Sequence, residues 1–218
     1  MKKSANREYC LFASDQHYNN YIFYKDCFDT TPLALRATYQ HLKCPSCGKI
    51  DEFQAFDLPF EDDIRIRSKD DMFFTSDDLF CLSDHARRVI ESTGIEGIDF
   101  RSLPSNQPYS IAVPTVFVAV DTERAGFENE GQKCNMCGRY EGVFVGPLRE
   151  SYSPPLDPMK FFVPSVFNES RLGRKFIFHV SDAIRIIIKT HKLKGVQFIP
   201  PTSEDNLAPY ILVPYTGA

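Results

Sequence analysis

The stretch Cys44-Pro45-Ser46-Cys47-Gly48 decides the fold, because the same pattern returns at Cys134-Asn135-Met136-Cys137-Gly138. In each C-x-x-C-G motif, a tight turn between the cysteines aims both sulfur atoms at one ion. The glycine that follows accepts backbone angles that a side chain would strain. Four thiolates in two pairs match a closed tetrahedral zinc site, which leaves no position for a substrate. We therefore predict one structural Zn²⁺ ion, bound by Cys44, Cys47, Cys134 and Cys137.

The two cysteine pairs lie 90 positions apart, whereas a compact zinc ribbon brings its second pair much sooner. The ion would thus join two distant parts of the chain. Unrelated buried thiols and a redox pair are the alternatives. Redox C-x-x-C pairs usually lie at a helix N-terminus, where the helix dipole lowers one thiol pKa. Here each pair is followed by a glycine and a strand-like run, which favours a metal knuckle. His41 precedes Cys44 by three positions, but the paired cysteines already complete the shell.

The composition indicates one folded domain over residues 1–218. It does not favour binding to nucleic acid. Of its 218 residues, 43% are hydrophobic and 19 are phenylalanine, which is typical of a globule with a sizeable core. The net charge is −4, whereas a protein that binds nucleic acid through its phosphates needs an excess of basic residues. We therefore expect no nucleic-acid partner.

The cysteine usage favours a reducing compartment. Four of the seven cysteines lie in the metal-type pairs, and Cys10, Cys27 and Cys81 remain as expected small buried residues. The basic residues at the N-terminus are not followed by an apolar segment of signal-peptide length, and no run reaches the ~20 apolar residues of a membrane span. We expect a cytoplasmic protein without membrane contact.

Alternating and capped patterns predict an α+β fold. Two helices are expected, one starting at Ser83 and ending near Gly94, the other starting at Ser181. Strands are expected at 21–24, 33–39, 53–58, 64–67, 98–100, 111–120, 142–145, 195–198 and 209–213. Pro114 suggests an edge or a break within the clearest of these runs.

The two halves of the sequence align with each other. Residues 79–101 match 177–199 without a gap at an offset of 98, the knuckles match at 90, and Pro108-Tyr109 matches Pro209-Tyr210 at 101. The identical pairs include Phe80 with Phe178, Ser83 with Ser181, Asp84 with Asp182, Arg87 with Arg185, Ile90 with Ile188, Gly97 with Gly195 and Phe100 with Phe198. Chance similarity between two capped helices is the alternative. The ordered series favours an internal duplication, with halves at 33–120 and 121–218 that share the zinc ion.

The sequence offers no catalytic constellation, and we predict that the protein is not an enzyme. Ser83 and Ser181 are expected helix caps, the histidines are scattered, and phosphate-loop and H-E-x-x-H motifs are absent. The remaining candidate is an acidic stretch, which is either a solvated loop or a surface for a basic partner. Its carboxylates belong to Glu61, Asp62, Asp63, Asp70, Asp71, Asp77 and Asp78.

The two knuckles, with the helix ends G-I-E-G-I-D-F and K-L-K-G-V-Q-F, resemble the double-CXXCG family, a paralogous set best known in myxobacteria. The resemblance covers the chain from Cys44 to the last predicted strand. The residues that match the family motif are Cys44, Cys47, Gly48, Cys134, Cys137 and Gly138. Some members are immunity proteins encoded beside polymorphic or contact-delivered toxins. The resemblance implies a protein that binds and blocks a cognate toxin. A zinc-ribbon nucleic-acid-binding or regulatory protein and a thiol-redox enzyme are the alternative functions.

Overall fold

The computed structural model describes residues 8–13, 20–25, 34–104, 107–118, 128–144, 157–164, 168–169 and 174–200, and shows a mixed α+β architecture with few helices. The helices are η1 (a 3-10 helix, Ala37–Leu42), α1 (Glu52–Asp57), α2 (Asp84–Thr93) and α3 (Asp182–Thr190). The strands are β1 (Glu8–Ala13), β2 (Met72–Phe74), β3 (Phe80–Ser83), β4 (Ile98–Ser102), β5 (Tyr109–Pro114), β6 (Phe117–Val118), β7 (Glu128–Lys133), β8 (Tyr140–Phe144), β9 (Val163–Pro164), β10 (Asn168–Glu169), β11 (Arg174–Lys175), β12 (His179–Ser181) and β13 (Val196–Ile199).

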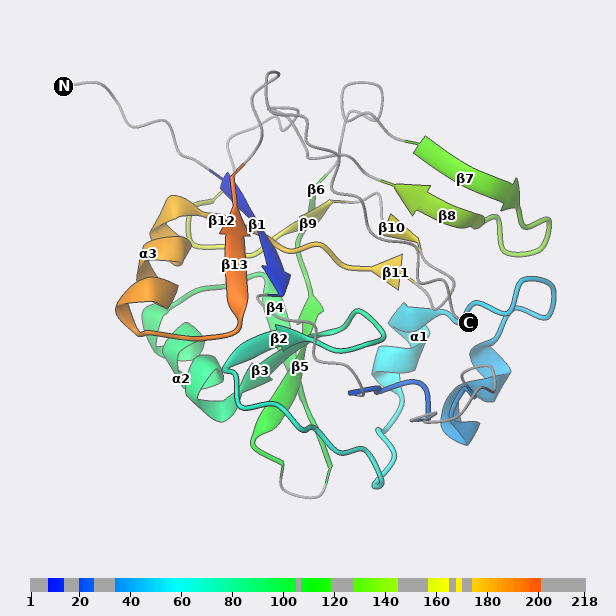
Figure 1. Ribbon diagram of the computed structural model, residues 1–218, viewed down its shortest axis with the longest axis horizontal. Helices are drawn as coiled ribbons and strands as arrows, with labels where there is room; N and C mark the ends of the chain where they lie inside the picture. Colours follow the sequence, from blue (N-terminus) through cyan, green and yellow to red (C-terminus); the bar gives the residue numbers. More distant parts are fainter. Residues whose placement is uncertain are drawn as a thin grey trace.

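The described strands form four small sheets, ordered β2-β3-β5-β4, β12-β1-β13, β11-β10-β8-β7 and the parallel pair β6-β9. Helices α2 and α3 lie together at one side of the first two sheets, whereas the β7–β8 hairpin and α1 lie at the opposite side (Figure 1). The cysteine knuckles therefore lie away from the two main helices.

The first unit is β3-α2-β4, with β5 inserted antiparallel between its two strands. Helix α2 starts as predicted, because the Ser83 hydroxyl accepts a hydrogen bond from the Ala86 N–H. It ends at Gly94, whose φ of 71° is left-handed. The buried side chains Ala86, Val89 and Ile90 face the sheet.

The second unit, β12-α3-β13, has the same arrangement, but its middle strand is β1 from the N-terminal end (Figure 1). The registers agree. Ile111 of β5 lies opposite Cys81 of β3, and Cys10 of β1 lies opposite His179 of β12. Since Cys81 and His179 are matched positions in the sequence alignment, β1 fills in the second unit the place that β5 fills in the first.

A segment paired with each unit contacts the glycine turn of the other unit. Met72 lies in β2, which pairs with β3, and Phe161 precedes Phe162, which forms a bridge with His179 of β12. The Phe161 N–H donates to the Glu96 carbonyl at 2.8 Å, and the Met72 N–H donates to the Lys194 carbonyl at 2.9 Å. A Cβ on the next residue, Gly97 or Gly195, would lie 2.0 Å from the Phe161 carbonyl oxygen or 2.1 Å from that of Met72. Both turns thus need glycine for the close approach of a backbone as well as for positive φ.

The core is continuous and rich in phenylalanine. Between the two units, Phe80 contacts Phe178 with ring centroids 4.9 Å apart, and Phe161 packs beside both. Phe56 and Phe176 extend the aromatic cluster toward α1. One hydrophobic cluster therefore includes residues from both halves of the sequence.

Several predicted strands are wrong. Residues 53–58 were expected as a strand, but α1 forms there, because the Asp51 carboxylate accepts from the Phe53 and Gln54 N–H groups. Residues 64–67 are assigned to no strand. The Ile66 N–H donates to the Gln107 side chain and the Arg67 N–H to that of Asn20.

The predicted strands at 21–24 and 33–39 reduce to a single bridge between Tyr24 and Leu35 in the described residues, and η1 takes the end of the second. Within 111–120, β5 ends at Pro114 and the short β6 follows, so the break at this proline is confirmed. The predicted strand at 98–100 lies in β4, and most of 195–198 and of 142–145 lies in β13 and β8. The segment 209–213 lies outside the described residues.

Candidate metal centre

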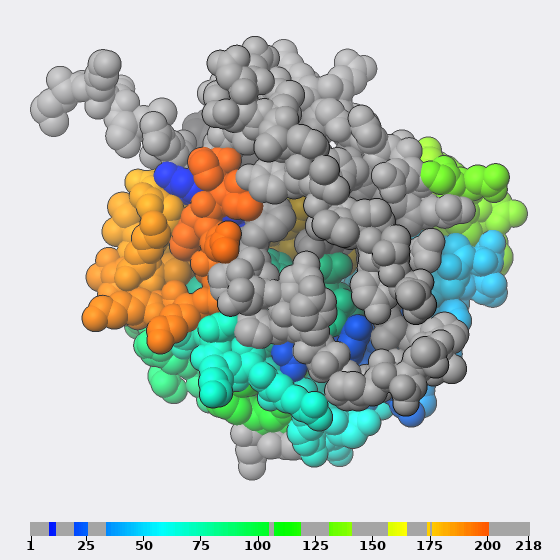
Figure 2. Space-filling model, in the orientation of Figure 1, coloured from blue at the N-terminus to red at the C-terminus, as the bar shows by residue number. Residues whose placement is uncertain are grey.

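The structure brings Cys44, Cys47, Cys134 and Cys137 together, as predicted from the motif spacing. The first pair lies between η1 and α1, and the second in the turn between β7 and β8. The Sγ atoms of Cys44 and Cys134 are 3.8 Å apart, those of Cys47 and Cys137 are 3.5 Å apart, and all four lie within 4.8 Å of one another. In Figure 2 the two segments are neighbours at the edge of the molecule.

The two knuckles have the same backbone hydrogen bonds. In the first, the Gly48 N–H donates to the Cys44 carbonyl at 2.9 Å, and in the second Gly138 donates to Cys134 at 3.0 Å. Both glycines have positive φ, 79° and 73°. The turn chemistry explains the glycine in each motif, because a non-glycine residue in this conformation is strained.

The sulfur geometry fits a tetrathiolate metal site. With metal–sulfur bonds of about 2.3 Å, tetrahedral geometry separates neighbouring sulfurs by about 3.8 Å, close to the two measured cross-pair distances. Two cysteines are exposed and two are half-buried, so the site lies at the surface. Four soft sulfur ligands in this arrangement suit zinc or iron rather than a hard cation. The cluster is therefore compatible with a bound transition metal.

The thiols differ in their electrostatic surroundings. Backbone N–H groups of Cys137 and Met136 lower the pKa of Cys134 to about 6, and the equivalent groups of Cys47 and Ser46 lower the pKa of Cys44. Desolvation of the sulfur raises the pKa of Cys47 to about 12, although the residue as a whole is exposed. The backbone N–H groups thus stabilise the thiolate of the first cysteine in each knuckle, and the thiolate is the form that binds metals.

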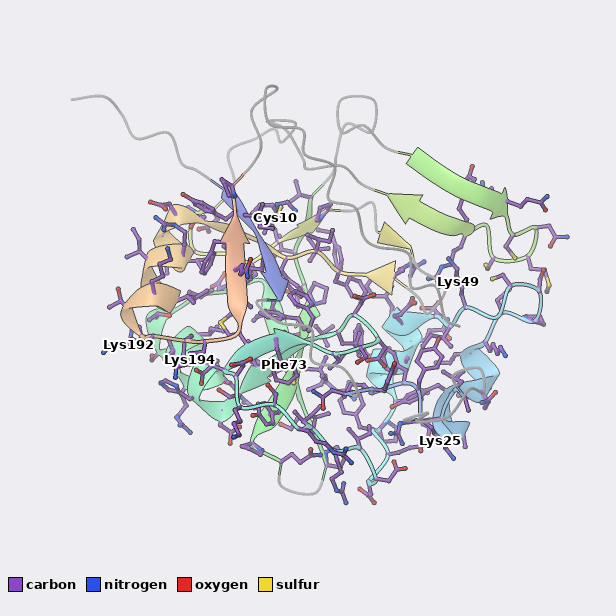
Figure 3. The ribbon with its side chains drawn as sticks, in the orientation of Figure 1. Cys10, Lys25, Lys49, Phe73, Lys192 and Lys194 are labelled. Atoms are coloured by element: carbon purple, nitrogen blue, oxygen red, sulfur yellow. The ribbon has the colours of Figure 1, made fainter. Side chains whose placement is uncertain are left out.

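Two basic residues directly after the knuckles tie the segments to each other. The buried Lys49 donates from Nζ to the Tyr140 carbonyl at 2.6 Å, and Arg139 donates from its guanidinium to the Ile50 carbonyl at 2.5 Å. Figure 3 shows Lys49 where the first knuckle faces the hairpin. Lys49 and Arg139 are equivalent positions at the knuckle offset, as are Ile50 and Tyr140. Each half therefore donates to the other in the same way.

A buried carboxylate completes this contact. Glu52 is 2% exposed and accepts from both terminal nitrogens of Arg139, at 3.1 and 3.3 Å, and from the Arg174 N–H at 2.7 Å. Sequence reasoning missed Lys49, Arg139 and Glu52. The signal for the first two was present, because a basic residue follows the glycine of both C-x-x-C-G motifs.

The acidic stretch does not form one cluster of free carboxylates. Asp77 is buried and accepts from the Ile22 and Phe23 N–H groups. Glu61 and Asp63 pair with Arg36. The Asp71 carboxylate accepts from the Ser83 hydroxyl and the Lys194 N–H, and contacts His85.

The remaining acidic residues of the stretch are Asp62, which is exposed, and Asp70 and Asp78, which are half-buried. All seven acidic residues of the stretch have contacts within the protein, and a partner-binding role for the stretch stays a prediction.

The other candidates lie in structural positions. Ser83 and Ser181 are helix caps, as predicted. Cys81 is fully buried, and Cys10 is half-buried with Sγ 3.5 Å from the ring nitrogens of His179. Burial lowers the pKa of His179 to about 3. Cys27 lies outside the described residues.

No protein-family model matches the chain, and no curated protein matches it significantly. In the part of the chain that the structure describes, the helices are too short or too polar to cross a membrane.

Proposed function

We propose that the four cysteines bind one structural Zn²⁺ ion that joins the two halves of the chain. The observation that carries this proposal is the convergence of four sulfurs from segments 90 positions apart within 4.8 Å. Four protein ligands fill a tetrahedral shell, so the ion would have no open position for catalysis. Its role would be to hold the first knuckle against the β7–β8 hairpin.

An internal duplication accounts for the shared arrangement of the two units. Support comes from the equal registers of β5 and β1, the paired glycine turns and the reciprocal bonds of Lys49 and Arg139. In this proposal the ion lies between equivalent cysteines, Cys44 opposite Cys134 and Cys47 opposite Cys137.

For the biological role, we propose that this chain is a cytoplasmic immunity protein and not an enzyme. It would neutralise a cognate bacterial toxin by forming a stoichiometric complex. The proposal rests on the resemblance of the double knuckle to the double-CXXCG family. A surface metal centre with a closed ligand set is consistent with a binding protein. The exposed carboxylates Asp62 and Asp63 remain candidate contacts for a basic partner.

The metal is tested by elemental mass spectrometry of protein purified without added zinc, beside Cys134→Ser and Cys137→Ser. We expect about one zinc per chain, lost in both variants. Reversible disulfides without metal would instead favour the thiol-redox alternative, to which the low pKa of Cys134 gives some support.

The immunity role is tested by co-expressing the protein with the product of any toxin-like gene found beside its own, and by measuring survival and complex formation by size-exclusion chromatography. We expect rescue and a stable complex. If neither is observed while zinc is present, the immunity role fails and the metal site stands. A salt-sensitive shift of DNA or RNA would then favour the nucleic-acid alternative.

A further inference from the structure

We propose that Lys49 and Arg139 are positioning residues that hold the four sulfurs in metal-binding geometry before the ion arrives. This inference rests on the metal site of the proposed function, and extends it from the ligands to the residues that arrange them. It implies that metal enters a preformed site, rather than creating the site by folding the chain around itself.

The first step of the argument is the position of the two side chains. Each lies immediately after the glycine of its knuckle and reaches across to the backbone of the opposite segment, to Tyr140 or Ile50. These bonds hold the segments together one residue beyond each cysteine motif. A small displacement of either segment would therefore separate the sulfur pairs.

The second step is burial. Lys49 is 5% exposed, and the side chains of Arg139 and Glu52 are 9% and 3% exposed. Charged groups are seldom buried to this degree unless they are paired or hydrogen-bonded. Hydrogen bonds that charged groups make away from water are strong, and are not replaced easily by solvent. The contact between the segments thus uses groups that are not metal ligands.

The third step is a comparison within the same chain. Lys43 precedes the first knuckle as Lys133 precedes the second, and both side chains are exposed. Lys43 and Lys49 carry the same charge and flank the same two cysteines. Lys49 donates from its side chain to the opposite half, whereas Lys43 makes no such side-chain hydrogen bond among the described residues. A difference between these two lysines therefore separates positioning from simple attraction between positive charge and thiolates.

The experiment is a Co²⁺ titration followed by thiolate charge-transfer absorption, with competing chelator, on wild type, Lys49→Met and Lys43→Met. Methionine keeps an unbranched apolar stem and removes the ammonium group. We expect Lys49→Met to raise the Co²⁺ dissociation constant about 10- to 100-fold, the range for residues that orient metal ligands. Lys43→Met should change it less than about threefold. Equal effects of the two substitutions would overturn the proposal.

A second variant covers the case in which Lys49→Met fails to fold. Arg139→Lys keeps a positive charge beside Glu52 but loses the fork that bonds Glu52 and Ile50 together. We expect weaker Co²⁺ binding with an unchanged far-ultraviolet circular dichroism spectrum. A dissociation constant equal to that of wild type would count against positioning.

A readout without metal tests preorganisation directly. Dibromobimane, a reagent that bridges two nearby thiols, is added to metal-free wild type and Lys49→Met, and the bridged peptides are identified by mass spectrometry. We expect bridges between Cys44 and Cys134 in wild type and fewer in the variant. Absence of these bridges in wild type would overturn the proposal even if Co²⁺ binds. Absence of Co²⁺ binding with the bridges present would refute the metal site instead.

Discussion

The rings of Phe80 and Phe178 meet with centroids 4.9 Å apart, and they occupy equivalent positions of the two units. Each ring comes from the residue at the start of, or just before, the first strand of its unit, β3 or β12. Both are at most 1% exposed. The hydrophobic core therefore contains a contact between two residues at matched positions of the sequence alignment.

We expect Phe80→Ala and Phe178→Ala each to lower the free energy of unfolding by about 3–5 kcal/mol, because each leaves a cavity in a closed core. Urea unfolding followed by circular dichroism measures this loss. The double variant should lose less than the sum of the single losses, since the rings contact each other. Phe117→Ala, at a 41% exposed position, is the control and should lose much less.

The glycine turns allow a matched comparison. Gly94→Ala should cost about 1 kcal/mol, because φ is positive but a Cβ meets nothing within 4 Å. Gly97→Ala should cost more, since its Cβ would lie 2.0 Å from the Phe161 carbonyl oxygen and force the units apart. Thermal unfolding compares the two variants. Equal losses would show that conformational strain alone explains both positions.

Asp77 fixes the segment 20–25 to the rest of the molecule. Its carboxylate accepts from the Ile22 and Phe23 N–H groups at 2.9 and 2.7 Å and from the Thr75 hydroxyl at 2.7 Å. Asp77→Ala would leave these buried donors without an acceptor, and we expect a loss of about 2–4 kcal/mol in urea unfolding. Asp77→Asn retains an acceptor oxygen and should lose clearly less. A larger loss in Asp77→Asn would contradict this explanation.

His179 should make the fold sensitive to acid. Burial lowers the pKa of His179 from 6.5 to about 3. Between these pH values the imidazole is protonated in the unfolded chain and neutral in the folded protein. Its contribution to stability is complete above pH 6.5. It falls by up to about 1.4 kcal/mol per pH unit as the pH drops toward 3.

Urea unfolding of wild type and His179→Leu between pH 4 and 8 measures this effect. The variant should show a smaller loss at low pH. Parallel profiles would show that other groups cause the acid sensitivity.

Local chemistry made part of the fold predictable from the sequence. The caps Ser83 and Ser181 and the terminating Gly94 act within one helical turn, and both main helices form as expected. The four cysteines were found for the same reason, because each knuckle is a five-residue turn. The prediction of a strand at 53–58 was wrong because Phe53, Ala55 and Phe56 fit a helical face as well as an alternating strand. The preceding Asp51, which caps the N-terminus of α1, favours the helix.

The pairing of strands that are far apart in the sequence could not be predicted. The alignment of the halves suggested that 209–213 repeats β5, and it gave no role to the first residues of the chain. The structure places β1 in that position of the second unit. No local pattern of residues 8–13 identifies partners that follow so much later in the chain. The same holds for Glu52, whose partner Arg139 is 87 positions away.

The place of β1 has a consequence for synthesis on the ribosome. Cys10 pairs with His179, which is synthesised 169 residues later. At about 5–20 residues per second, this interval is roughly 8–35 s. During that time β3, α2, β4 and β5 are synthesised, while β1 has neither of its two partner strands. Because β1 lies between β12 and β13, loss of residues 8–13 would leave the second unit without its middle strand.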